Sequence, residues 1–147
     1  MRPDPDKVLM GVAMAVMAEL PPEIRTPFGQ SKAQMGGMLL LVLAQESDRL
    51  VDRLNKENEA VAAILFDAAR LLSQELAMRV KEAIRGRVPP DLRVSTLVGI
   101  NDRLRGLLID VHSVVEGLTS PEAVITDARI WAELVESTRR RHVEVPR

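Results

Sequence analysis

The chain has 147 residues, of which 46% are hydrophobic and 28% charged, a composition typical of a single globular domain over residues 1–147. Its 21 acidic and 20 basic residues nearly cancel, so we expect no binding to nucleic acid and none to a membrane. Cysteine is absent, which excludes disulfides, thiolate metal ligands and thiol catalysis and is typical of a cytoplasmic protein. The polar N-terminus is unlike a secretory signal, and the longest apolar run, residues 35–44, is too short to span a membrane.

Residues 4–20 repeat apolar side chains at helical spacing, which predicts a first helix that ends at two prolines. The Pro and Gly content of residues 21–31 predicts a loop. A second helix is expected over residues 31–55 and a third over residues 58–85, because one helix across both ranges would be unusually long. Asn58 can cap the third helix.

Gly86 and two prolines end the third helix, and a fourth is expected between Asp91 and Gly117. A fifth helix begins after Ser120, which can cap it, and has proline at its first position. Its predicted buried stripe comprises Val124, Ala128, Trp131, Val135 and Thr138. No segment alternates as a strand would, so the sequence predicts an all-α fold, an up-and-down bundle of four to five helices.

Gly36 and Gly37 lie inside the second predicted helix, where two glycines cost about 2 kcal/mol of helix propensity relative to two alanines. Two interpretations account for them. A neighbouring helix approaches closely at this point, which we favour, or the glycines leave a gap for a ligand.

The sequence also contains a weak internal similarity. A shift of 43 residues aligns residues 48–73 with residues 91–116 and pairs Asn58 with Asn101. A duplication would place these two asparagines at equivalent positions, at the starts or kinks of the third and fourth helices. Two amphipathic helices with similar caps would also produce such an alignment, so both interpretations stay open.

No motif for catalysis stands out. Glycine-rich phosphate loops, dinucleotide fingerprints and nucleophile elbows are absent, and a nucleophile–base pair could form only around His112 or His142. His112 and Glu116 share a helix face within reach of one metal ion, but the paired motifs of a di-iron bundle are missing. We therefore expect no catalytic residue, no metal and no cofactor.

A ligand pocket, if the bundle has one, is expected between the second, third and fourth helices. The candidate ligand-binding residues are Glu46, Asn58, Asn101 and His112. Glu46 follows the apolar run directly, and a carboxylate near arginines at the mouth of a core can anchor a ligand. Structural ion pairs also explain the same charged residues, and we favour that interpretation.

The stretch INDRLRGLLIDVH, residues 100–112, followed by Glu116, resembles a sequence segment of small bacterial helical proteins. Those proteins are associated with phosphotransferase-like and acyl-CoA-dehydrogenase-like neighbours. The resemblance covers little more than these residues and includes no catalytic motif. It implies an accessory role in acyl-CoA metabolism.

Residues 35–43 are apolar on every helix face, so the second helix must be covered all round. Either a second subunit covers it or it is the central helix of a monomer, and we favour a homodimer. The sequence thus predicts a non-enzymatic helical bundle that acts through self-association and through contact with a larger protein partner. The alternative is a small-molecule binding protein, for an acyl-type ligand, with the pocket described above.

Overall fold

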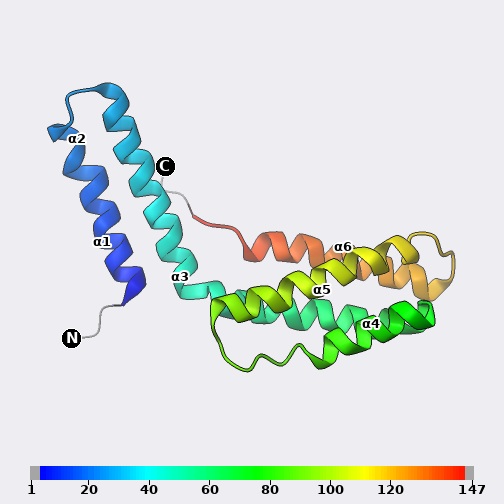
Figure 1. Cartoon of the computed structure of the whole chain (residues 1–147). Coiled ribbons are helices and arrows are strands. Elements are labelled where there is room, and N and C mark those ends of the chain that lie inside the picture. The colour runs from blue at the N-terminus through cyan, green and yellow to red at the C-terminus, as the bar shows by residue number, and fades with distance from the viewer. Residues whose placement is uncertain (1–3, 145–147) are drawn as a thin grey trace. The chain divides into compact units, whose positions relative to one another are not determined.

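The structure is a computed structural model that describes residues 4–144 (Figure 1). In these residues the chain is 83% helical and has no strand, which confirms the all-α prediction. Five helices have twelve residues or more, and the elements in chain order are α1 (Pro5–Ala18), α2 (Leu20–Glu23), α3 (Pro27–Ala68), a 3-10 turn (Ala69–Leu71), α4 (Gln74–Arg85), α5 (Val94–Val115) and α6 (Pro121–Arg140). None of the described helices is both long and apolar enough to cross a membrane.

The chain divides into two compact units. One comprises the residues up to Leu50 together with those from His142 onward, and the other comprises Val51–Arg141. Helix α3 contributes residues to both units. The expectation of a single domain stays a prediction.

The unit of residues 51–141 is an up-and-down bundle. Its four helical segments are residues 51–68 of α3, then α4, α5 and α6, and consecutive segments run in opposite directions (Figure 1). Apolar side chains from all four meet in one core, which includes Val61, Leu65, Val80, Leu104 and Ile130. Burial of such side chains stabilises the bundle by roughly 1.5–3 kcal/mol each.

The predicted break at residues 55–58 is wrong, because α3 is continuous from Pro27 to Ala68. Asn58 does not cap a helix, since its side chain is buried and hydrogen-bonded to other helices. The chain instead breaks after Ala68, and Ser73 caps α4 by accepting a hydrogen bond from the backbone N–H of Leu76. Ser73 followed by Gln and Glu is a capping signal that the sequence contains.

Part of the predicted loop over residues 21–31 is helical. Leu20–Glu23 forms a short helix, whose two prolines lie in the first turn, where a missing N–H costs little. Helix α3 begins at Pro27, because the Thr26 hydroxyl accepts a hydrogen bond from the backbone N–H of Gly29 and proline suits the first helical position. The prolines thus start helices here rather than exclude them.

The ends predicted for two later helices are confirmed. Ser120 caps α6 by accepting a hydrogen bond from the backbone N–H of Ala123. Gly86 follows the last residue of α4, as predicted for the end of that helix. Caps and stop signals next to short loops are local features, so the sequence alone was sufficient to locate them.

The buried stripe predicted for α6 is wrong. Trp131 and Val135 are about half exposed, and Val124 is more exposed than either. The helix instead buries Ala123, Thr126, Ile130, Glu133 and Ser137. Polar residues lie on this inner face because they have partners there; Glu133, for example, accepts two hydrogen bonds from Arg140.

Seven of the position pairs given by the 43-residue shift are buried in both α3 and α5. They are Leu54 and Leu97, Glu57 and Ile100, Asn58 and Asn101, Val61 and Leu104, Ile64 and Leu107, Leu65 and Leu108, and Ala68 and Val111. The two asparagines therefore occupy equivalent places, but these places lie inside helices, so the prediction that they lie at helix starts is wrong. A duplication and two helices with similar amphipathic patterns both still account for the alignment.

In the unit of residues up to Leu50, α1 packs against the first part of α3 at Gly37. A Cβ atom on Gly37 would overlap Cγ of Met17 and would lie 3.0 Å from the carbonyl oxygen of Ala13. A Cβ atom on Gly36 would meet nothing within 4 Å. Close helix approach therefore explains Gly37, while Gly36 faces open space.

The adjacent glycines provide a matched pair of variants. Gly36→Ala should stabilise the helix by up to about 1 kcal/mol, because alanine is the better helix former and has room. Gly37→Ala should destabilise the packing of α1 on α3, because Met17 and the Ala13 carbonyl would have to move. Hydrogen exchange of the amides in residues 5–50 measures both effects. Equal protection of these amides from exchange in the two variants would contradict close packing of α1 on α3 at Gly37.

Candidate functional site

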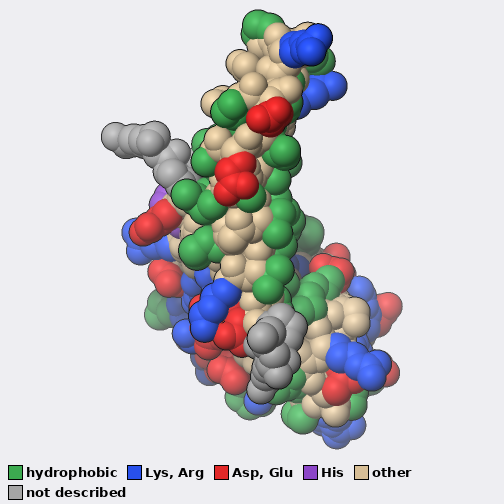
Figure 2. All heavy atoms as spheres, turned by 90° about the vertical axis from the view of Figure 1, so that its left-hand side faces the viewer, with side chains coloured by type: hydrophobic (Ala, Val, Ile, Leu, Met, Phe, Trp, Pro, Cys, Tyr) green, Lys and Arg blue, Asp and Glu red, His purple; other side chains and the backbone are tan. Residues whose placement is uncertain are grey.

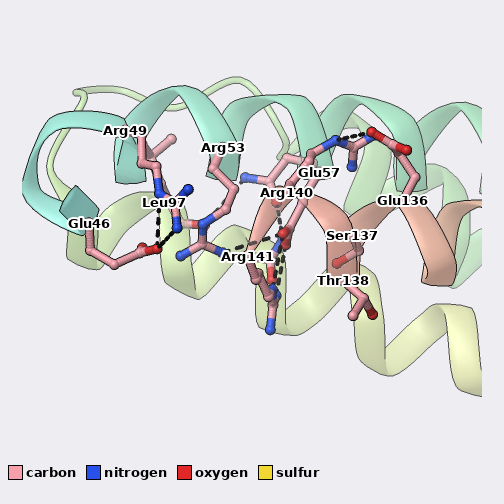
Figure 3. A network of polar contacts seen from close by, with 12 residues as sticks. Glu46, Arg49, Arg53, Glu57, Leu97, Glu136, Ser137, Thr138, Arg140 and Arg141 are labelled. Carbon is pink, nitrogen blue, oxygen red and sulfur yellow. Dashed lines mark hydrogen bonds and ion pairs between the residues drawn. The ribbon is translucent and has the colours of Figure 1, made fainter. Parts of the chain in front are cut away.

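The most buried charge of the described chain is Glu57 on α3, whose side chain is fully inaccessible to solvent. Arg141, directly after α6, donates two hydrogen bonds to it, from Nε to Oε1 at 3.1 Å and from Nη2 to Oε2 at 2.8 Å. Arg53, one turn earlier on α3, donates from Nη1 to Oε1 at 3.3 Å (Figure 3). The pair of hydrogen bonds from Arg141 is the arrangement in which arginine binds a carboxylate most strongly.

A third arginine, Arg105 on α5, places Nη2 3.6 Å from Oε2 of Glu57. Its Nη2 also donates to the hydroxyl of Ser137 on α6. Its Nε atom is buried and has no hydrogen-bond partner among the described residues. We call Glu57 with Arg53, Arg105 and Arg141 the Glu57 cluster. It joins α3, α5 and the end of α6.

Two buried asparagines extend the Glu57 cluster. The side-chain amide of Asn101 donates to Oδ1 of Asn58 at 2.9 Å and to Oε2 of Glu57 at 3.4 Å. Asn58 in turn donates to the backbone carbonyl of Leu97 at 3.3 Å. These amide groups therefore bond to one another and to the bundle, which is how buried polar groups avoid the cost of losing water.

The arginines determine the charge state of Glu57. Burial raises its pKa, but the hydrogen bonds and charge of Arg141 and the charges of Arg105 and Arg53 outweigh burial and lower the pKa to about 2. Glu57 is thus ionised at neutral pH and has no tendency to take up a proton. Such a carboxylate is unsuited to general acid–base chemistry and well suited to holding helices together.

A second polar group lies at the turn between α5 and α6. Nε2 of His112 is 2.8 Å from Oδ1 of Asp127 and 3.5 Å from Oε1 of Glu116. The indole of Trp131 meets the imidazole edge to face, with ring centroids 5.5 Å apart. We call His112, Glu116 and Asp127 the His112 cluster. Their ligand atoms all lie within 4.8 Å of one another, so they could meet at one metal ion.

The structure brings together only two of the four residues predicted to bind a ligand. Asn58 and Asn101 are directly hydrogen-bonded. His112 lies on the same helix as Asn101, eleven residues and so about 16 Å further along. Glu46 belongs to the other unit, where it accepts hydrogen bonds from Arg49.

The polar residues that sequence reasoning missed are Glu57, Arg105 and Arg141. The predicted break at residues 55–58 places Glu57 between two helices, although Glu57 lies at helical spacing from Leu54 and Val61 on the buried face. A continuous helix would have shown it to be buried. Nothing in the sequence pairs Glu57 with Arg141, because the contact joins residues 84 positions apart.

One pocket of about 460 Å³ borders Asn58 and is also lined by Asn55, Glu59, Ala63, Arg87, Val88 and Pro89. Asn101, His112 and Glu46 do not line it. Of the four predicted ligand-binding residues Asn58 alone lines this pocket, and the Asn58 amide is already hydrogen-bonded. The ligand pocket predicted between the second, third and fourth helices stays a prediction.

Substitution of Glu57 tests the Glu57 cluster. Glu57→Gln should lower the free energy of unfolding by roughly 2–3 kcal/mol, because the neutral amide loses the charge-assisted contacts with Arg53, Arg105 and Arg141, whose side chains stay partly accessible to solvent. Asp52→Asn is the control, since Asp52 forms an exposed ion pair with Lys56 and should matter by less than about 0.5 kcal/mol. Urea denaturation measures both. Similar losses in the two variants would show that the cluster contributes little.

The lowered pKa also predicts a dependence on pH. Glu57 ionises more readily in the folded protein than at its usual pKa of 4.5, so it stabilises the fold above pH 4.5, on the order of 3 kcal/mol. That contribution should be lost as the pH falls from 4.5 to about 2. The difference in unfolding free energy between the unmodified protein and Glu57→Gln should therefore shrink over this range. A difference that stays constant with pH would contradict the ionised state.

Comparisons of the chain with protein-family models, with curated proteins and with solved structures found no match. The resemblance of residues 100–112 to small bacterial helical proteins, and the role in acyl-CoA metabolism that it implies, stay predictions.

Proposed function

We propose that the protein is a non-enzymatic helical-bundle protein that acts through self-association and protein–protein contact, and that residues 5–50 provide the contact surface. The observation behind this proposal is the lack of a core in that segment. Among its described residues the buried ones are Ala13 and Ala44, with Gly37 at the helix contact. A helical hairpin that buries so little cannot be stable by itself.

The same segment exposes nine large apolar side chains, each at least 46% accessible: Val8, Met10, Val12, Met14, Leu20, Phe28, Met35, Leu39 and Leu43. Figure 2 shows hydrophobic side chains along this hairpin with few charged ones between them. Each leaves on the order of 100 Å² accessible, so together they expose about 900 Å², comparable to the ~800 Å² that each partner contributes to a standard interface. Contiguous exposed apolar side chains, such as Met35, Leu39 and Leu43 on α3, mark an interaction surface.

The charges of the segment favour a second copy as the partner. Between Val8 and Gln45 the charged residues are Glu19, Glu23, Arg25 and Lys32, which balance to zero. A neutral apolar face meets itself across a two-fold axis without repulsion between like charges. On α3, Met35, Leu39 and Leu43 are four residues apart and form one exposed stripe for such a contact.

Analytical ultracentrifugation of the full chain at micromolar concentration tests the proposal, with a species of about twice 16.3 kDa expected. Leu39→Glu should give a monomer, because it places a charge in the stripe. Met78→Glu is the control, since Met78 on α4 is 58% exposed but lies outside the segment, and it should leave the dimer intact.

A 16.3 kDa species in the unmodified protein would overturn self-association. In that case, strong protection of the amides of residues 5–50 from hydrogen exchange would mean that the chain covers the hairpin by itself. Loss of the dimer in both variants would show that the exposed stripe of α3 is not the specific contact. Far-ultraviolet circular dichroism confirms that each variant keeps its helices.

A further inference from the structure

The His112 cluster has the donor atoms of a transition-metal site. We propose that His112, Glu116 and Asp127 bind a divalent transition metal ion of the zinc class. The sequence alone showed two ligands, because His112 and Glu116 are one helical turn apart. The structure adds the third, Asp127, which α6 brings against His112 across the turn between the helices.

The three ligand atoms lie within 4.8 Å of one another, so shifts of the two carboxylates would let them meet at one ion. Ligand atoms about 2.0–2.1 Å from a tetrahedral zinc ion are separated by roughly 3.4 Å. Nε2 of His112 and Oε1 of Glu116 are already 3.5 Å apart. Nε2 of His112 and Oδ1 of Asp127 are 2.8 Å apart, so Asp127 would move outward by about 0.6 Å to admit the ion.

The charges of the cluster also favour a cation. Glu116 and Asp127 bring two negative charges, and no lysine or arginine in the described part of the chain forms an ion pair with either of them. His112 can offset one charge at most. A divalent ion balances both carboxylates, and one imidazole with two carboxylates suits zinc, cobalt or manganese better than calcium or magnesium.

The surroundings leave room for a further ligand. The imidazole of His112 is 17% exposed and rests against Trp131, which limits its rotation. A pocket of about 210 Å³ is lined by Glu116 and Asp127 together with Val115, Leu118, Ala123 and Val124. Three protein ligands with water in the remaining position is the arrangement of an open, exchangeable site rather than a closed structural one.

Cobalt(II) titration of the full chain without a histidine tag tests the site with two independent signals. Bound cobalt should show visible absorption bands, and it should quench the fluorescence of Trp131, which is the only tryptophan in the chain and contacts His112. Zinc added afterwards should abolish the absorption and restore the fluorescence, because it competes for the same ligands.

Variants separate the metal site from an ion pair. His112→Ala should abolish both signals, and Asp127→Asn should weaken cobalt binding at least tenfold while keeping the shape of the side chain. His142→Ala is the control, since His142 is the other histidine of the chain, and it should bind as the unmodified protein does. An unmodified protein that shows neither signal, or Asp127→Asn that binds unchanged, would overturn the site and leave a histidine–carboxylate ion pair.

Discussion

A carboxylate that is removed entirely from water imposes a requirement on the bundle of residues 51–141, because the energy lost with its hydration must be recovered from fixed partners. Glu57 recovers it from arginines of three different chain segments, namely Arg53 on α3, Arg105 on α5 and Arg141 after α6. The positions of these segments are therefore coupled. A shift of α5 or of the end of α6 would remove part of the compensation of a buried charge, whereas a shift in a purely apolar contact costs far less.

This requirement also explains how far the sequence could predict the bundle. Helix ends depend on nearby residues, so Ser120 and Gly86 were sufficient to locate them. The buried face of α6 depends on distant residues, because Glu133 and Ser137 are buried only where Arg140 and Arg105 meet them. Without knowledge of those partners, apolar periodicity was the best guide to the buried face of α6, and it predicted the wrong face.

In the residues up to Leu50, by contrast, the sequence identifies the apolar residues correctly but does not show that they are exposed. Their apolar side chains were recognised from the sequence, and the structure leaves them exposed along the hairpin, with alanine and glycine at the helix contact. Gly37 lets α1 and α3 approach closely, while the larger side chains of Met35 and Leu39 lie on an exposed face of α3. A sequence identifies apolar residues readily, but it does not tell whether the chain or a partner covers them.

The Glu57 cluster and the His112 cluster differ in net charge, and this difference determines whether each can bind a metal ion. The Glu57 cluster holds one carboxylate among three arginines with its oxygens fully engaged, so it offers a metal ion no free ligand and repels it. The His112 cluster holds two carboxylates with a single histidine and is open to a pocket. Burial and excess positive charge suit the first to structure alone, whereas exposure and excess negative charge allow the second to exchange a ligand with solvent. The Glu57 cluster therefore has more hydrogen bonds, but the His112 cluster is better suited to binding a metal ion.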